Sequence, residues 1–133
     1  AAFQAEYFQS KFKKRGMLLY QVLKDTKLHF PPGELKVASI GGGPGTDASG
    51  LVWLQRELYP QNTFLCTLYD FEKSWKRYVK VLGEMFGEHV MLESYCCDVT
   101  VGLDSFGVNQ KVEVDDVNLV ILAYVCHETS IKA

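Results

Sequence analysis

The sequence lacks any apolar run that approaches the roughly 20 residues needed to cross a bilayer. Its first residues, Ala1 to Glu6, also lack the basic-then-apolar order of a secretory signal. We therefore expect a protein that is not secreted, that has no membrane partner and that resides in the cytoplasm or the nucleus.

The chain has no cysteines at the C-x-x-C spacing typical of metal sites and redox motifs. Each of its four cysteines falls in, or at the end of, a segment with the composition of a buried strand. A buried free thiol behaves as a small apolar group, so we expect reduced core cysteines and no metal site. These residues are Cys66, Cys96, Cys97 and Cys126.

Neither sign of charge dominates, because 14 Lys and Arg stand against 16 Asp and Glu, for a net charge of -2. Such a balance creates no large field to attract nucleic acid, although it does not exclude an RNA substrate. No internal repeat or low-complexity linker divides the chain. With 133 residues, 47% of them hydrophobic, one compact core is the expected outcome.

Short apolar segments alternate with amphipathic ones along the chain. This alternation predicts an α/β fold: a parallel sheet with right-handed crossovers and helices on both faces. The expected strands cover 35–40, 63–69, 90–97 and 117–125.

The helices are predicted from apolar residues at helical spacing. Residues 5–27 predict two short helices, broken near Gly16, in an N-terminal helical segment (1–33) that precedes the sheet domain (34–133). A further helix should end near Tyr59. The clearest apolar stripe lies in the segment that follows the second strand, and it consists of Trp75, Tyr78, Val79, Leu82, Met85 and Phe86.

A glycine-rich turn, Gly41-Gly42-Gly43-Pro44-Gly45, joins the first strand to a helix. A turn of this kind gathers backbone N–H groups and a helix N-terminus at the carboxyl edge of a parallel sheet. Glycines leave no side chain between the backbone and a ligand. The turn therefore predicts a site for a nucleotide-like ligand.

The strand and turn together, Val37 to Gly45, resemble the first motif of class I S-adenosylmethionine-dependent methyltransferases, G-x-G-x-G after a hydrophobic strand. The resemblance implies a Rossmann-like fold, S-adenosylmethionine as the cofactor, and transfer of its methyl group to an unidentified small molecule, protein or RNA. It implies that Gly41, Gly43 and Gly45 approach the methyl donor.

Other landmarks of the family follow in order and carry further implied roles. Asp70 matches the acidic residue that holds the two ribose hydroxyls, and a carboxylate is suited to accepting two such bonds. Phe71 is implied to pack on the adenine ring. Asp98 resembles the acceptor for the adenine amino group, with Val99 beside the ring, and Tyr124 lies where the family borders the methionine part of the donor.

One position departs from the family pattern. Ser39 stands where the family usually has an Asp or Glu beside the methionine amino group, and Asp47, just past the turn, is a candidate replacement. No catalytic residue is assigned. His127 and Glu128 follow the fourth strand, where they fit a substrate-orienting pair and a solvated loop equally well.

Two alternative functions remain open from the sequence. Gly43-x-Gly45-x-x-Ala48 also satisfies a dinucleotide fingerprint, which would indicate an NAD(P)-dependent oxidoreductase. Ser39, together with the absence of an Asn-Pro-Pro-Tyr-like sequence after the fourth strand, is compatible with a non-catalytic module that binds S-adenosylmethionine.

The family's sheet has the strand order 3-2-1-4-5-7-6, and the chain supplies the first four strands. The resemblance therefore predicts the order 3-2-1-4 in an incomplete fold, a fragment that need not be active by itself. An uncovered apolar edge strand is a template for pairing with other chains. We accordingly expect either further chain beyond Ala133 or self-association through the exposed edge.

Overall fold

The computed structural model describes residues 12–41, 45–70, 76–96 and 116–122. Strands and helices alternate through these ranges, as the sequence predicts. In chain order they are α2 (Lys13–Thr26), β1 (Gly33–Ile40), α3 (Thr46–Leu58), β2 (Asn62–Asp70), α4 (Lys76–Phe86), β3 (Val90–Cys96) and β4 (Leu119–Ile121).

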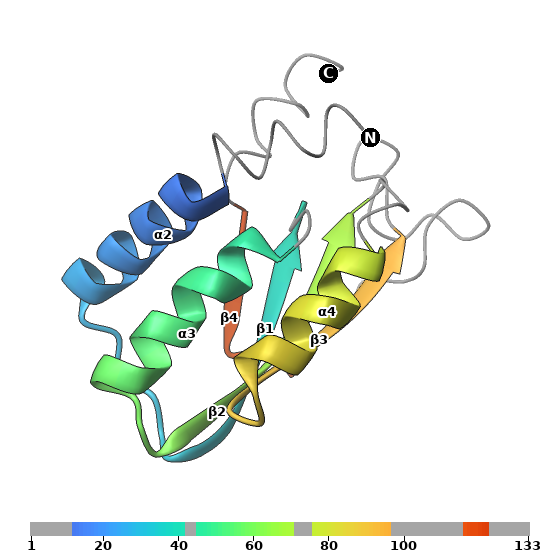
Figure 1. Cartoon of the computed structure of the whole chain (residues 1–133). Helices are drawn as coiled ribbons and strands as arrows, with labels where there is room; N and C mark the ends of the chain where they lie inside the picture. Colours follow the sequence, from blue (N-terminus) through green and yellow to red (C-terminus); the bar gives the residue numbers. More distant parts are fainter. Residues whose placement is uncertain (1–11, 42–44, 71–75, 97–115, 123–133) are drawn as a thin grey trace, which may run out of the picture.

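The strands form one sheet in the order β3-β2-β1-β4, and all three pairings are parallel. The predicted α/β, Rossmann-like fold with strand order 3-2-1-4 is confirmed. Ile40 is in register with Tyr69, and Asp70 with Cys96. The carboxyl ends of β1, β2 and β3 therefore lie at the same edge of the sheet (Figure 1).

The helices α2, α3 and α4 lie on the same face of the sheet (Figure 1). Every second residue of a strand points to that face, and on β1 these residues are Leu35, Val37 and Ser39, all of them buried. No helix among the described residues covers the opposite face, so the prediction of helices on both faces is confirmed for one face and stays a prediction for the other.

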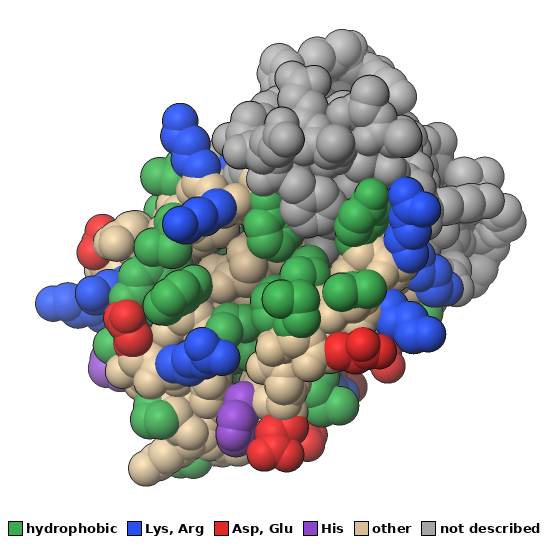
Figure 2. All heavy atoms as spheres, in the orientation of Figure 1, with side chains coloured by type: hydrophobic (Ala, Val, Ile, Leu, Met, Phe, Trp, Pro, Cys, Tyr) green, Lys and Arg blue, Asp and Glu red, His purple; other side chains and the backbone are tan. Residues whose placement is uncertain are grey.

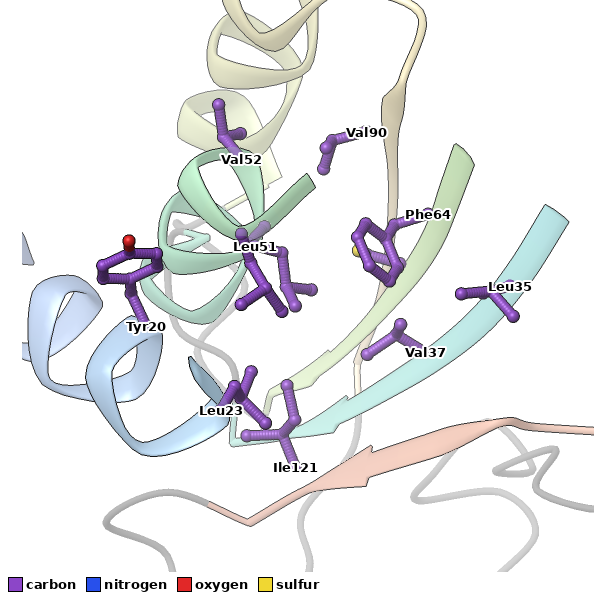
Figure 3. Packing of buried hydrophobic residues seen from close by; sticks show 12 residues of the cluster. Tyr20, Leu23, Leu35, Val37, Leu51, Val52, Phe64, Val90 and Ile121 are labelled. Atoms are coloured by element: carbon purple, nitrogen blue, oxygen red, sulfur yellow. The ribbon is translucent and has the colours of Figure 1, made fainter. Parts of the chain in front are cut away.

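The main core fills the space between this face and the helices (Figure 3). Phe64 of β2 is fully buried there, and the rings of Phe30 and Tyr59 each meet its ring edge-on with centroids 6.3 Å away. Tyr20 and Leu23 of α2 belong to the same cluster. The helix that precedes the sheet thus shares one hydrophobic core with it.

The predicted helix break at Gly16 is wrong, because α2 runs through this residue without interruption. Gly16 is buried and faces Gly50 of α3. A Cβ atom at Gly50 would lie 2.6 Å from the Gly16 carbonyl oxygen. The two glycines therefore allow the backbones of α2 and α3 to approach closely, and that contact is the reason for a glycine inside the helix.

The predicted apolar stripe of α4 is only partly covered. Val79 is buried, whereas Met85 is 71% exposed. α4 packs mainly on β3, which is an edge strand of the described sheet, and an edge strand covers only a narrow side of a helix. Trp75, the first residue of the stripe, lies outside the described residues.

The described part of the fourth strand is shorter than predicted, Leu119–Ile121. It is anchored to β1 just before it begins. The Asn118 side-chain oxygen accepts a hydrogen bond from the Lys36 N–H at 2.9 Å, and the Asn118 N–H donates to the Lys36 carbonyl oxygen at 2.8 Å. Residues 123–125, the remainder of the prediction, lie outside the described residues.

Cys66 is a free, buried cysteine on β2, as predicted. Burial and, to a smaller extent, the charge of Asp47 raise the pKa of its thiol to about 12. Because the thiolate is the reactive form, we expect Cys66 to remain unmodified by iodoacetamide in the native protein and to react fully in urea. Peptide mapping by mass spectrometry checks this, and rapid native labelling of Cys66 would contradict it. The other three cysteines lie outside the described side chains.

Candidate functional site

Gly41 follows β1 at the entrance to the glycine-rich turn. Its N–H donates a 2.6 Å hydrogen bond to the Tyr69 carbonyl oxygen, which extends the β1–β2 pairing by one residue. Its φ of 71° lies in the left-handed region that favours glycine. The chain thus leaves the sheet at Gly41. Residues 42–44, including the predicted site residue Gly43, lie outside the described residues.

Gly45 ends the turn and caps α3 with a φ of 106°. A Cβ atom here would lie 3.3 Å from the Leu82 side chain of α4, with Leu92 and Leu68 close behind. The backbone conformation therefore favours glycine at position 45, and a larger residue would also crowd the end of the Leu82 side chain. The only signal for this contact in the sequence is the place of Leu82 on the apolar stripe of α4, and the proposed approach of Gly45 to a ligand stays a prediction.

Asp70 is the last residue of β2 and is half-buried. Asp70 lies between the ends of β1 and β3. On one side its neighbour Tyr69 pairs with Ile40 of β1, and on the other side Asp70 itself pairs with Cys96 of β3. The fold thus brings Asp70 next to Gly41 at the carboxyl edge. Phe71, Asp98, Val99 and Tyr124 lie outside the described residues, so their roles remain predictions.

A buried polar pair lies directly behind the turn. The Ser39 hydroxyl of β1 donates a 2.6 Å hydrogen bond to Oδ2 of Asp47, in the first turn of α3. Ser39 is 1% exposed and Asp47 is 6% exposed. Burial raises the pKa of the Asp47 carboxyl to about 6, while the Ser39 hydrogen bond acts in the opposite direction. The residue that departs from the family pattern and its candidate replacement are therefore in direct contact.

Other kinds of site find no support in the described part of the chain. It contains no group of three or more His, Cys, Asp or Glu side chains placed to hold a metal ion. None of its helices has both the length and the apolar character required to span a membrane. On the helix-covered face, basic side chains occur in several separate places with acidic ones among them (Figure 2).

The fold defines an α/β, Rossmann-like class of protein, and comparison with solved structures agrees. The chain is similar to a protein of Methanococcus maripaludis described as a "putative S-adenosyl-L-methionine-dependent methyltransferase", with a TM-score of 0.54 and 15% sequence identity. The match covers 90% of this chain and 46% of that one. At this identity the similarity shows the fold alone.

The chain thus spans less than half the length of the structure it matches. No protein-family model matches it, and no curated protein matches its sequence. Strand order and structural similarity therefore show an α/β, Rossmann-like fold, without support from sequence relatives.

Proposed function

We propose that this chain binds S-adenosylmethionine and belongs to a methyltransferase whose acceptor is unidentified. The observation that carries the proposal is the meeting of Gly41 and Asp70 at the carboxyl edge of the sheet. Ligands of open α/β sheets bind at this edge. The similarity of the fold to a protein described as a methyltransferase supports the same ligand class.

The roles follow from the chemistry of an adenosyl group. Gly41 and Gly45, at the two ends of the turn, are proposed to bring backbone without side chains close to the ligand. The Asp70 carboxylate can accept hydrogen bonds from both ribose hydroxyls. Phe71, Asp98 and Val99 are proposed to contact the adenine, and Tyr124 the methionine part of the donor. The donor itself supplies the reactive methyl group, and the protein supplies position and electrostatics.

The position of Asp47 argues against the alternative of a dinucleotide cofactor. In dinucleotide-binding folds the pyrophosphate lies on the N-terminus of the helix after the glycine turn. Here the first turn of that helix carries a buried carboxylate, Asp47. Negative charge on both the pyrophosphate and an ionised Asp47 would oppose binding, because like charges repel. A ligand without phosphate fits this turn better.

Calorimetry with S-adenosylhomocysteine, the demethylated donor, tests the proposal. We expect measurable binding to the whole chain. Asp70→Ala should lose about tenfold or more in affinity, because the variant cannot accept hydrogen bonds from the ribose. Asp25→Ala, which removes an exposed carboxylate near the end of α2, serves as the control and should bind as the wild type does.

Binding of NADH in place of S-adenosylhomocysteine would overturn the proposal in favour of an oxidoreductase. Equal affinity of the wild type and Asp70→Ala for S-adenosylhomocysteine would refute the role of Asp70. If the protein binds the donor but transfers no methyl group to a panel of small molecules, proteins and RNAs, the non-catalytic module becomes the better description.

A further inference from the structure

β3 presents an open edge in the described sheet, because β2 is its only partner there. The pairing of the two strands runs through seven consecutive residues of β3, Val90–Cys96, without a bulge. Proteins commonly block an open edge with lysine, proline or a bulge, and β3 has none of the three. Its edge is therefore able to pair with a further strand.

The pairing shows which main-chain groups are available at this edge. The Phe64 N–H donates a 2.9 Å hydrogen bond to the His89 carbonyl oxygen. In a parallel ladder, alternate residues direct both of their main-chain groups to the same side, so His89 and Met91 face β2. Leu92 and Ser94 therefore direct their N–H and carbonyl groups outward, where no described residue pairs with them.

The helix-covered side of this edge is basic. A Cβ atom at Gly83 of α4 would lie 3.9 Å from Leu92 Cβ, so this side of the helix lies over β3. Lys76 and Lys80 precede Gly83 by seven and three residues and share its side of α4. Both lysines are exposed, and neither forms an ion pair with a described residue. Figure 2 shows basic side chains gathered at the start of α4, at the right of the molecule.

The start of α4 is an unfavourable place for these cations, because a helix N-terminus repels positive charge. α4 nevertheless begins with Lys76 and Arg77, and it has no acidic residue in its first turn. The arrangement therefore does not serve the stability of the helix. Binding of an anionic partner would account for it.

The opposite side of the edge is apolar with one acid. Side chains alternate along a strand, so Met91, Glu93 and Tyr95 lie on the face away from α4. Met91 is 53% exposed and Tyr95 is 38% exposed. Glu93 is exposed and would repel an acidic neighbour on this face. A strand added to β3 would thus meet cations on one face and mainly apolar side chains on the other.

We propose that the outer edge of β3 binds an extended segment of a partner protein in which acidic and apolar side chains alternate. The main chain of this segment pairs with Leu92 and Ser94. Its acidic side chains face Lys76 and Lys80, and its apolar side chains pack on the opposite face of β3. Strand addition takes affinity from main-chain hydrogen bonds and specificity from alternate side chains. A peptide fits better than a nucleic acid, because only a peptide uses both the main-chain groups and the apolar face.

Fluorescence anisotropy with a labelled peptide of alternating glutamate and valine tests the proposal. We expect saturable binding that weakens as salt is added. Lys76→Glu/Lys80→Glu should weaken it about tenfold, because two exposed charges are reversed, and a peptide with lysine in place of glutamate should bind the wild type about tenfold less tightly. Lys13→Glu/Lys14→Glu makes the same change at exposed positions in the first turn of α2 and should leave the affinity unchanged.

Hydrogen exchange followed by NMR reports the strand pairing itself. A saturating concentration of the peptide should slow exchange of the Leu92 and Ser94 N–H groups by about tenfold. The Met91 N–H, which faces β2, should change little. Ser94→Pro removes one outward donor and leaves the pairing with β2 intact, so it should weaken peptide binding about fivefold.

Absence of peptide binding, or binding that leaves the exchange of Leu92 and Ser94 unchanged, would overturn the proposal. Tighter binding of labelled oligouridylate than of the peptide at this surface would identify the partner as RNA and overturn it too. A wild-type dimer that protects the same N–H groups would replace the partner protein by a second copy of this chain. Circular dichroism of each variant separates lost binding from lost folding.

Discussion

Asparagine in place of Asp47 should raise the free energy of unfolding at pH 7.5 by about 3 kcal/mol. Burial raises the pKa of this carboxyl from 3.8 to about 6, and a change of one pKa unit corresponds to about 1.4 kcal/mol. The asparagine side chain would keep an acceptor for the Ser39 hydroxyl, so the substitution removes the buried charge and preserves the hydrogen bond.

The sign of the pH dependence follows from linkage. The folded state binds the Asp47 proton more tightly than the unfolded state does. The contribution of this group to stability is therefore fully present below about pH 4 and is lost as the pH rises to about 6. The advantage of Asp47→Asn should vanish near pH 4 and reach its maximum above about pH 7. Urea denaturation of both proteins across this range measures the difference.

Asp25→Asn provides the comparison, because it removes an exposed carboxylate on α2 and should shift stability by less than about 0.5 kcal/mol. A loss of stability in Asp47→Asn at pH 7.5 would mean that the ionised carboxylate has a structural partner. A gain in stability combined with loss of ligand affinity would instead reveal a charge kept for function at the expense of stability.

Gly50→Ala should lower the free energy of unfolding by about 2 to 3 kcal/mol, within the range of overpacking in a core. The added Cβ would lie 2.6 Å from the Gly16 carbonyl oxygen, which belongs to the backbone of α2 and cannot rotate away. α2 and α3 would have to separate, and the contacts of Tyr20 and Leu23 with the core would weaken.

Gly83→Ala in α4 is the matched control, since its Cβ would lie 3.9 Å from the nearest atom, Leu92 Cβ. With space available, the better helix propensity of alanine should stabilise the protein by about 0.5 to 1 kcal/mol. Thermal unfolding should therefore move in opposite directions for the two substitutions. A stabilised Gly50→Ala would show that the helices can separate without cost.

The strands of the sheet could be predicted because their causes are local, whereas their order, 3-2-1-4, was implied by the resemblance to a known family. A short aliphatic run ending in glycine marks β1, and runs of the same kind ending at Asp70 and near Cys96 mark its neighbours. The close contact of Gly16 with Gly50 could not be predicted, because the reason for Gly16 lies in another helix, far along the chain. A glycine that allows close approach and one that ends a helix look the same in sequence.

The candidate site was predictable in part for the same reason. The alignment of Gly41 with Asp70 follows from parallel pairing, which places strand ends together. The sequence indicated a relation between Ser39 and Asp47, because Asp47 was the candidate replacement for the acidic residue that the family has at position 39. The structure joins the two side chains by a hydrogen bond. The burial of this pair and the resulting pKa depend on how closely α3 packs on the sheet, and no local pattern reports that distance.

The contact between α2 and α3 also includes the N-terminal end of α3, which carries Asp47. A Cβ at Gly16 would lie 3.2 Å from the Thr46 carbonyl oxygen, in that helix's first turn. Contact with α2 thus supports the first turn of α3, in which Asp47 lies. Random mutagenesis with selection for lost activity should accordingly yield substitutions at the contact between α2 and α3, at residues that do not contact a ligand.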